Sequence, residues 1–221
     1  GFMGGPGEKQ IESDKRQLTE KINRLKKKII KINKIRDIQR YRRIKNKIPV
    51  ISLVGYTNSG KSTLFNLITK SKVLSKDMLF ASLDSTIRNG YLNGFNFLFI
   101  DTVGFIRELP TTLIDAFKST LDEIINSDLI LHVRDISDSQ YLAHKFEVLK
   151  ILSEIGINKD DERIIEVINK IDLIENEKNI HNLYDRKSVM ISAKEKKGLD
   201  LLKKKILNSI ISKNNNDKLL E

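Results

Sequence analysis

The sequence predicts an α/β fold in which helices flank a doubly wound, mostly parallel sheet, with a long basic helical segment ahead of it. From residue 49 to residue 212, short apolar runs alternate with amphipathic stretches of helical length. A glycine-bounded loop separates the first apolar run from the first of these stretches. Such alternation is typical of parallel strands joined by helices that cover both faces of one sheet.

The glycine-bounded loop lies between the apolar run 48–54 and a helical pattern at 63–68. Its residues are Gly55, Tyr56, Thr57, Asn58, Ser59, Gly60, Lys61 and Ser62. Glycines let backbone N–H groups crowd around a phosphate, and the first turn of a helix adds unpaired donors and a positive dipole end. Lys61 can contact the β- and γ-phosphates, and Ser62 can bind Mg²⁺. The loop therefore indicates a P-loop NTPase, although the pattern arises by chance in about one chain in a hundred of this length.

Composition limits the class of protein. With 221 residues, the chain suits one globular domain of about 150 to 200 residues and an appendage. It contains no cysteine, which excludes disulfides and thiolate zinc sites and fits a reducing, cytoplasmic compartment. No run of 18 apolar residues exists, so we expect no transmembrane segment. The three histidines lie far apart, without the spacing of metal ligands.

The basic charge is confined to the first part of the chain. Residues 1–49 carry 16 Lys and Arg against 5 Asp and Glu, which accounts for the whole formal net charge of +11. A localised positive field predicts a polyanionic partner, either nucleic acid or an anionic membrane surface. The alternative is a genomic bias in which lysines only solvate a helix, but such a bias would spread the excess evenly.

Residues 1–7 contain four glycines, and we interpret them as a flexible connector, from a longer protein or left by cloning. Residues 8–48 contain no Pro or Gly, and their apolar residues recur at the spacing of a coiled-coil seam. The seam consists of Ile11, Leu18, Ile22, Leu25, Ile29 and Ile32. After Ile32 the spacing changes to three residues, which indicates a bend, a register shift or a second helix. A continuous helix needs a partner to cover its seam, whereas two halves could pair with each other.

The main predicted domain covers residues 49–212, and residues 213–221 are expected to form a flexible tail. Strands are predicted at 48–54, 94–100, 129–133, 163–168 and 188–191. Amphipathic helices are predicted after the P-loop and at 113–125, 140–155 and 198–211. The hydroxyl-rich residues 71–87 show little periodicity, and we interpret them as a connection.

Polar motifs follow three further strands. They are Asp101, Thr102, Val103 and Gly104; then Asn169, Lys170, Ile171 and Asp172; and last Ser192, Ala193 and Lys194. In doubly wound sheets ligands bind beyond the carboxyl ends of the strands, so we expect these motifs and the P-loop to form one site. The carboxylate of Asp101 can approach a metal through water, and Gly104 can offer its N–H to a terminal phosphate.

In this order the motifs resemble the signature of a translation-factor-class GTPase. Residues 55–66, residues 101–110 and the opening residues 1–12 are more narrowly similar to HflX proteins, the ribosome-associated GTPases of the Obg-HflX superfamily. The resemblance covers nearly the whole chain. It implies GTP hydrolysis to GDP, with Mg²⁺, coupled to binding of the large ribosomal subunit in splitting, rescue or biogenesis. Relatives also carry an N-terminal domain, so we expect this fragment to bind nucleotide without full splitting activity.

Base recognition is assigned to the third and fourth motifs. Asp172 can accept two hydrogen bonds from the guanine edge, whereas adenine presents an acceptor where guanine has a donor. Asn169 and Lys170 would brace the loop and the ring, and Ala193 would offer its N–H to the guanine oxygen. A site built on such bonds rejects the wrong base because its carboxylate would be left unpaired.

By the same resemblance, the first switch loop comprises Phe80, Ala81, Ser82, Leu83 and Asp84. Ser82 stands where relatives usually have the threonine that binds Mg²⁺ when the third phosphate is in place, and Thr86 competes for that role. Phe105 follows the second motif, where many GTPases carry a glutamine that orients the attacking water. We therefore expect slow intrinsic hydrolysis, and the sequence names no catalytic base.

The segment 8–48 resembles the helical part next to the GTPase domain of HflX, which implies contact with rRNA. Two alternatives stay open. One is a membrane-surface regulatory GTPase whose basic amphipathic segment lies on anionic lipid, although an aliphatic face with Tyr41 as its one aromatic residue favours a protein or RNA partner. The other is an ATPase in which N-K-x-D is coincidental. We expect a monomer.

Overall fold

The computed structural model describes residues 6–46, 48–70, 86–102, 104–105, 121–174 and 188–219. The chain forms two compact units, Gly1–Lys47 and Ile48–Glu221. No helix within these described ranges is long and apolar enough to cross a membrane.

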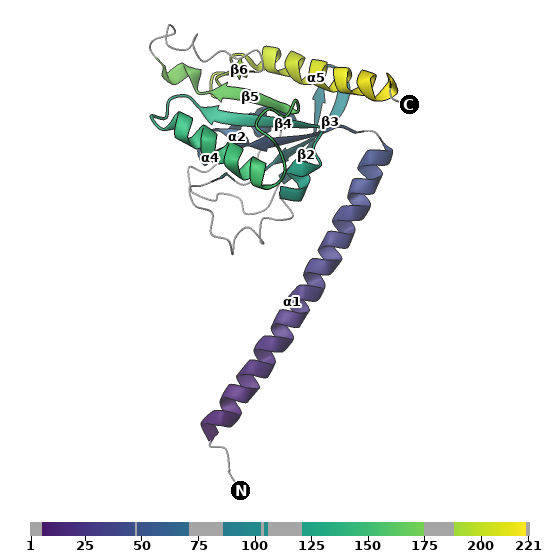
Figure 1. Cartoon of the computed structure of the whole chain (residues 1–221), viewed down its shortest axis with the longest axis vertical. Helices are drawn as coiled ribbons and strands as arrows, with labels where there is room; N and C mark the ends of the chain where they lie inside the picture. Colours follow the sequence, from purple (N-terminus) through teal and green to yellow (C-terminus); the bar gives the residue numbers. More distant parts are fainter. Residues whose placement is uncertain are drawn as a thin grey trace. The chain divides into compact units, whose positions relative to one another are not determined.

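The first unit contains one unbroken helix, α1 (Pro6–Lys45), drawn in purple and blue in Figure 1. It begins at Pro6, inside the predicted connector, because proline is tolerated in the first turn of a helix. It continues past Ile32 without a break. Of the two alternatives, one continuous helix or two helical halves, the structure therefore shows the continuous helix. Four seam residues with described side chains, Ile11, Leu18, Ile22 and Leu25, are each between 51 and 59% exposed.

The second unit is built on a six-stranded sheet with the order β2-β3-β1-β4-β5-β6. The strands are β1 (Val50–Val54), β2 (Thr86–Leu92), β3 (Phe95–Asp101), β4 (Leu129–Asp135), β5 (Ile164–Asn169) and β6 (Ser188–Met190). Strand β2 pairs antiparallel with β3, and the other described pairs are parallel. The predicted mostly parallel sheet is confirmed.

Helices cover both faces of this sheet (Figure 1). They are α2 (Lys61–Thr69), α4 (Tyr141–Glu154), α5 (Leu199–Leu219) and helical residues 121–125. A 3-10 turn, η1 (Ile171–Leu173), follows β5. Phe65 of α2 and Ile206 of α5 share one core with Leu53, whereas Val148 of α4 shares the other with Val54. Neighbouring residues of a strand face opposite sides, which is why Leu53 and Val54 enter different cores. The predicted doubly wound arrangement is confirmed.

Strand β2 is absent from the sequence-based prediction, which ends a connection at residue 87 and places no strand between residues 55 and 93. The turn between β2 and β3 is Asn93-Gly94, whose φ angles are 49° and 85°. Two consecutive positive φ angles are typical of the tight hairpin turn that Asn-Gly favours. This dipeptide is the signal that would have revealed the hairpin.

Helix α5 extends beyond its predicted end. The flexible tail was predicted to start at residue 213, but the helix continues to Leu219. Residues 212–219 contain neither Gly nor Pro, so no helix-breaking residue ends the helix at residue 211. The loss of apolar periodicity after Ile210 therefore does not mark the end of the helix.

Gly90 of β2 is expected to tolerate no larger side chain. A Cβ at this position would lie 2.6 Å from Cε2 of Phe99, which is fully buried. We expect Gly90→Ala to lower the free energy of unfolding by roughly 1–3 kcal/mol, because the ring must move in a packed core. Urea unfolding measures the change. Asn89→Ala, at the exposed neighbouring position, should change it by less than about 0.5 kcal/mol; equal stability of the two variants would contradict this packing.

Candidate functional site

The P-loop joins the end of β1 to the start of α2, and two of its glycines lie against other strands. A Cβ at Gly55 would lie 2.2 Å from the Val133 carbonyl oxygen, and a Cβ at Gly60 would lie 2.2 Å from Asn169 Nδ2. Gly60 also has a φ of 90°, in the left-handed region. A side chain at either position would push the loop away from β4 or β5. Glycine is therefore needed for the loop to pack on the carboxyl edge of the sheet.

The side-chain ammonium of Lys61 lies inside the P-loop. Its side chain is 6% exposed, and its Nζ donates to the carbonyl oxygens of Gly55 at 3.1 Å and Tyr56 at 2.8 Å. Burial lowers the pKa of Lys61 to about 8, and the nearby Asp101 carboxylate opposes this shift. A phosphate next to Nζ would favour the charged ammonium form. The lysine is thus positioned before any anion arrives.

Asp101 ends β3 next to the P-loop and is 2% exposed. Within the described part of the chain its Oδ1 has no hydrogen-bond partner. Burial raises the pKa of Asp101, whereas the hydrogen bond with Ser62 and the charge of Lys61 lower it. A buried carboxylate oxygen beside a hydroxyl is an oxygen donor set of the kind that Mg²⁺ prefers. The residues present therefore fit this ion.

Residues 104 and 105 bring the chain after β3 back to the P-loop. The Thr57 N–H donates to the Phe105 carbonyl at 3.0 Å, and the Phe105 N–H donates to the Gly55 carbonyl at 3.1 Å. A Cβ at Gly104 would lie 2.9 Å from Thr57 Cα, so only glycine allows this approach. The Phe105 ring is 6% exposed and belongs to the core under α4. Its side chain therefore cannot orient water at the loop.

The other predicted site residues near β3 are either part of the sheet region or outside the described residues. The Thr102 hydroxyl is buried and donates to the Leu53 carbonyl at 2.6 Å, so it fixes the backbone. Thr86 begins β2 and lies opposite Asp101 in the sheet register. The remaining predicted residues of this region, Val103 and the switch-loop residues Phe80, Ala81, Ser82, Leu83 and Asp84, lie outside the described residues.

Asn169 joins three loops at one edge of the sheet. Its Nδ2 donates to the Ser59 carbonyl at 3.0 Å, and its Oδ1 accepts from the Ala193 N–H at 3.0 Å. With 2% of its surface exposed, this amide is a buried link between the P-loop, the end of β5 and residues 192–194. Here the Ala193 N–H is donated to Asn169, and its contact with a guanine oxygen stays a prediction.

Asp172 lies in η1 and is oriented by the last motif. Its Oδ1 accepts from Ser192 Oγ at 2.6 Å, and this hydroxyl accepts from the Glu195 N–H at 3.0 Å. The Ser192 bond holds the pKa of Asp172 below its usual range, with Lys194 and Lys197 acting in the same direction. The carboxylate is thus an ionised acceptor with a fixed orientation.

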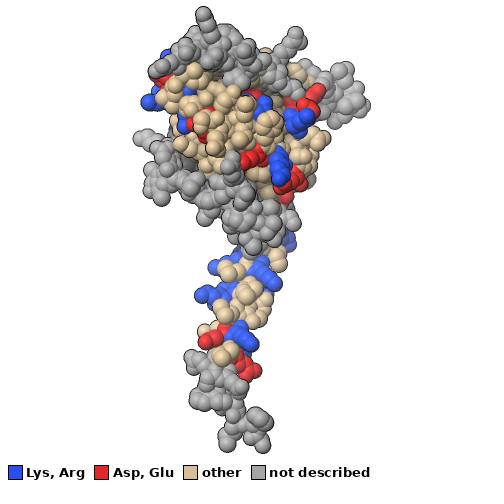
Figure 2. All heavy atoms as spheres, turned by 60° about the vertical axis from the view of Figure 1, so that its left-hand side comes forward, with Lys and Arg blue, Asp and Glu red and all other residues tan. Residues whose placement is uncertain are grey.

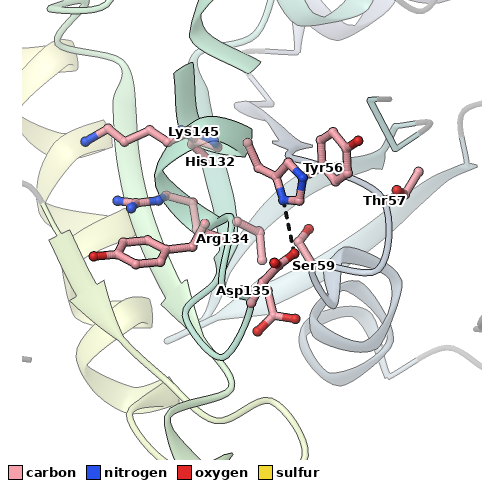
Figure 3. A pocket seen from close by; sticks show the side chains of 11 residues that line it. Tyr56, Thr57, Ser59, His132, Arg134, Asp135 and Lys145 are labelled. Atoms are coloured by element: carbon pink, nitrogen blue, oxygen red, sulfur yellow. Dashed lines mark ion pairs between the residues drawn. The ribbon is translucent and has the colours of Figure 1, made fainter. Parts of the chain in front are cut away.

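A small pocket lies between the P-loop, β4 and α4 (Figure 3). The Tyr56 ring stacks on the His144 ring, with centroids 3.6 Å apart and an interplanar angle of 8°. His144 Nδ1 in turn pairs with Asp138 at 3.0 Å, the contact dashed in the figure. The stack fixes the second residue of the P-loop against α4. Sequence reasoning missed it, because no pattern relates residue 56 to residue 144.

Arg134, which is buried, and Lys145, which is half-buried, both line the pocket. Arg134 pairs with Glu166 at 2.8 Å, and Lys145 pairs with the same carboxylate. Charged residues inside the apolar strands β4 and β5 were the available signal for this cluster. Burial lowers the pKa of the adjacent His132 to about 3; Glu166 opposes this shift, whereas Arg134, Lys145 and Lys61 add to it.

The fold and the site define a P-loop GTPase. Comparison of the sequence with known families finds two matches: "50S ribosome-binding GTPase" at residues 50–170 and "GTP-binding GTPase Middle Region" at residues 1–43. The chain belongs to the HflX group of these 50S ribosome-binding GTPases.

Individual relatives agree with this assignment. The chain is 46% identical to GTPase HflX of Magnetococcus marinus over 79% of its length and 40% of that protein. It is 45% identical to GTPase HflX of Lacrimispora saccharolytica over 90% of its length and 47% of that protein. It thus spans about half or less of these relatives. A solved GTP-binding protein from Sulfolobus solfataricus, in complex with GDP, has a TM-score of 0.59 and 30% identity, covering 82% of this chain and 61% of that one.

His132 is expected to make the fold less stable in acid. Its pKa is about 6.5 in an unfolded chain and about 3 in the fold. Below pH 6.5 the unfolded state therefore binds a proton that the folded state does not. Between pH 7 and pH 4.5 this should lower the free energy of unfolding by roughly 2–3 kcal/mol.

Urea unfolding at the two pH values, for the unsubstituted chain and for His132→Asn, measures this contribution. The variant should lose that part of the pH dependence. Glu166, whose pKa is lowered, also loses stabilising charge in acid, but it is present in both proteins. The same pH dependence in both proteins would show that His132 is not buried in its neutral form.

Proposed function

We propose that this chain binds GTP and GDP at the carboxyl edge of its sheet, hydrolyses GTP slowly, and uses the nucleotide state to control binding to the large ribosomal subunit. The observation that carries the proposal is the Asn169 amide, whose bonds to Ser59 and Ala193 join the P-loop to the base-recognition motifs. One guanosine nucleotide could then bind with its phosphates in the P-loop and its base at the base-recognition motifs.

Base choice would rest on Asp172. Guanine presents two neighbouring N–H donors, and an ionised carboxylate can accept both. The Ser192 hydroxyl and the charges of Lys194 and Lys197 favour that ionised form. Adenine would leave an acceptor facing the carboxylate, and the cost of that unpaired group is what excludes it.

The phosphates would lie in the P-loop, where backbone N–H groups and the Lys61 ammonium meet them. Ser62, with Asp101 behind it, would hold Mg²⁺, and Ser82 of the first switch loop would complete the site when a third phosphate is bound. The ion supplies positive charge that draws electron density from the transferring phosphoryl group. Lys61 adds a second cation, in a loop whose shape is already fixed by its contacts with Val133, Asn169 and Phe105.

Slow hydrolysis follows from Phe105. Because its ring lies in the core, the residue after D-x-x-G cannot orient water, and Gly104 contributes only its backbone N–H. Another group, from the chain or from the ribosome, would have to position the water. A bound ribosome would then accelerate turnover.

Ribosome binding would use the basic residues of α1. Figure 2 shows Lys and Arg side chains along the described part of this helix, and residues 1–49 hold the whole net charge of the chain. Such a helix can bind an RNA backbone by charge without reading its sequence. The match to a 50S ribosome-binding GTPase supports the large subunit and its rRNA as the partner. Splitting, rescue or biogenesis in the cytoplasm would be the role that this binding serves.

Asp172→Asn should relax the choice of base. The amide replaces one acceptor by a donor that meets the guanine N–H groups, so we expect GDP affinity to fall by at least about 100-fold while ADP affinity changes little. Competition of GDP and ADP against a fluorescent GDP analogue measures both. Ser192→Ala keeps the carboxylate and serves as the matched control, with a loss of about tenfold or less. Unchanged guanine preference in Asp172→Asn would contradict the assignment.

Sedimentation with purified large ribosomal subunits tests the switch. We expect tighter binding with a non-hydrolysable GTP analogue than with GDP or without nucleotide, because only the third phosphate can contact both the first switch loop and Gly104. Raising the salt concentration should weaken all three complexes, since the contacts of α1 are ionic. Equal affinity in all three nucleotide states would contradict a switch, and co-sedimentation with anionic liposomes alone would favour a membrane surface as the partner.

A further inference from the structure

Asp135 ends β4 at the same edge of the sheet, and both of its carboxylate oxygens have partners. Oδ1 accepts from the Ser137 N–H at 3.0 Å and from Ser137 Oγ at 2.6 Å. Oδ2 pairs with Lys170 Nζ at 2.6 Å. Bonds on both sides fix the direction of the carboxylate, and the carboxylate in turn fixes the lysine ammonium.

The ion pair is partly shielded from water. The side chains of Asp135 and Lys170 are 16% and 24% exposed. Charge pairs on an open surface contribute little because water screens them and the long side chains stay mobile. A short pair with most of its surface covered keeps a lysine side chain in one place more effectively.

The backbone around the pair is held by other bonds. Strands β4 and β5 are in parallel register from Ile130↔Ile164 to Asp135↔Asn169, and the Ile136 N–H donates to the Asn169 carbonyl at 3.1 Å. Loss of the ion pair would therefore leave the two strand ends together. What it would release is the side chain of Lys170.

Lys170 occupies a constrained place in the site. It stands between Asn169, which joins the loops, and the turn that carries Asp172, and its φ of 64° is uncommon for a residue other than glycine. Without Asp135, the Lys170 ammonium would lose the ion pair that holds it at the end of β4.

We propose that Asp135 is a positioning residue for guanine nucleotide, which acts through Lys170. The inference rests on the proposed function, in which Lys170 braces the base. A free lysine side chain samples many rotamers, and ordering it during binding costs affinity. Asp135 orders it beforehand, so the nucleotide meets a site that is already arranged.

A double-mutant cycle tests this role. The dissociation constant of a fluorescent GDP analogue, with Mg²⁺ present, is measured for the unsubstituted chain, Asp135→Asn, Lys170→Ala and the double variant. Asp135→Asn should bind about tenfold more weakly, mainly through faster dissociation. In the Lys170→Ala background the same substitution should change affinity by less than about twofold. Full additivity, or unchanged affinity in Asp135→Asn, would overturn the proposal.

Three further measurements complete the test. Asp200→Asn, which removes an exposed Asp–Lys pair on α5, is the matched control and should bind like the unsubstituted chain. Ser137→Ala removes one bond to Asp135 and should weaken binding by about two- to threefold; it carries the test if Asp135→Asn does not fold. Melting without nucleotide should not differ between Asp135→Asn and Asp200→Asn. If the unsubstituted chain fails to bind the analogue, the proposed function fails, whereas normal binding by Asp135→Asn overturns only this inference.

Discussion

The site depends on one buried amide. The Asn169 side chain has one donor bond to the P-loop and one acceptor bond to the Ala193 N–H, and a carboxylate or an aliphatic residue could not make both. These two bonds bring loops that are more than 20 residues apart in the sequence to one edge of the sheet. Because the amide is buried, its partners must stay in place, and the distance between the phosphate end and the base end of the site is set by the fold.

The loops that Asn169 joins are also closely packed. Gly55, Gly60 and Gly104 each lie where a Cβ would meet another part of the site at less than 3 Å. The P-loop therefore packs closely on the end of β4 at Gly55 and on the Asn169 amide at Gly60, and Gly104 packs on the P-loop. The Tyr56–His144 stack holds the P-loop against α4, and the ion pairs of Glu166 join β5 to β4 and α4. The result is a preorganised site, in which little order has to be gained on binding.

The sequence predicted the features that depend on local pattern. Apolar runs identified β1, β3, β4, β5 and β6, and the order of motifs placed Lys61, Asp101, Asn169 and Asp172 at the ends of strands that meet at one edge. Hairpin β2 was missed because its apolar alternation is weak and its Asn-Gly turn was not used. The end of α5 was misjudged because the apolar periodicity ends before the helix does. The Asp135–Lys170 pair, the His144 stack and the Asn169–Ala193 bond join residues with no fixed spacing, so only the three-dimensional structure could reveal them.

The central claim is that these loops form one site that recognises a guanine nucleotide. Titration calorimetry of GDP and of ADP into the chain and into Asn169→Ala tests it most directly. The account predicts heat on adding GDP, none on adding ADP at the same concentration, and loss of GDP binding in the variant by at least about tenfold. Equal binding of the two nucleotides, or unchanged GDP binding by Asn169→Ala, would contradict it.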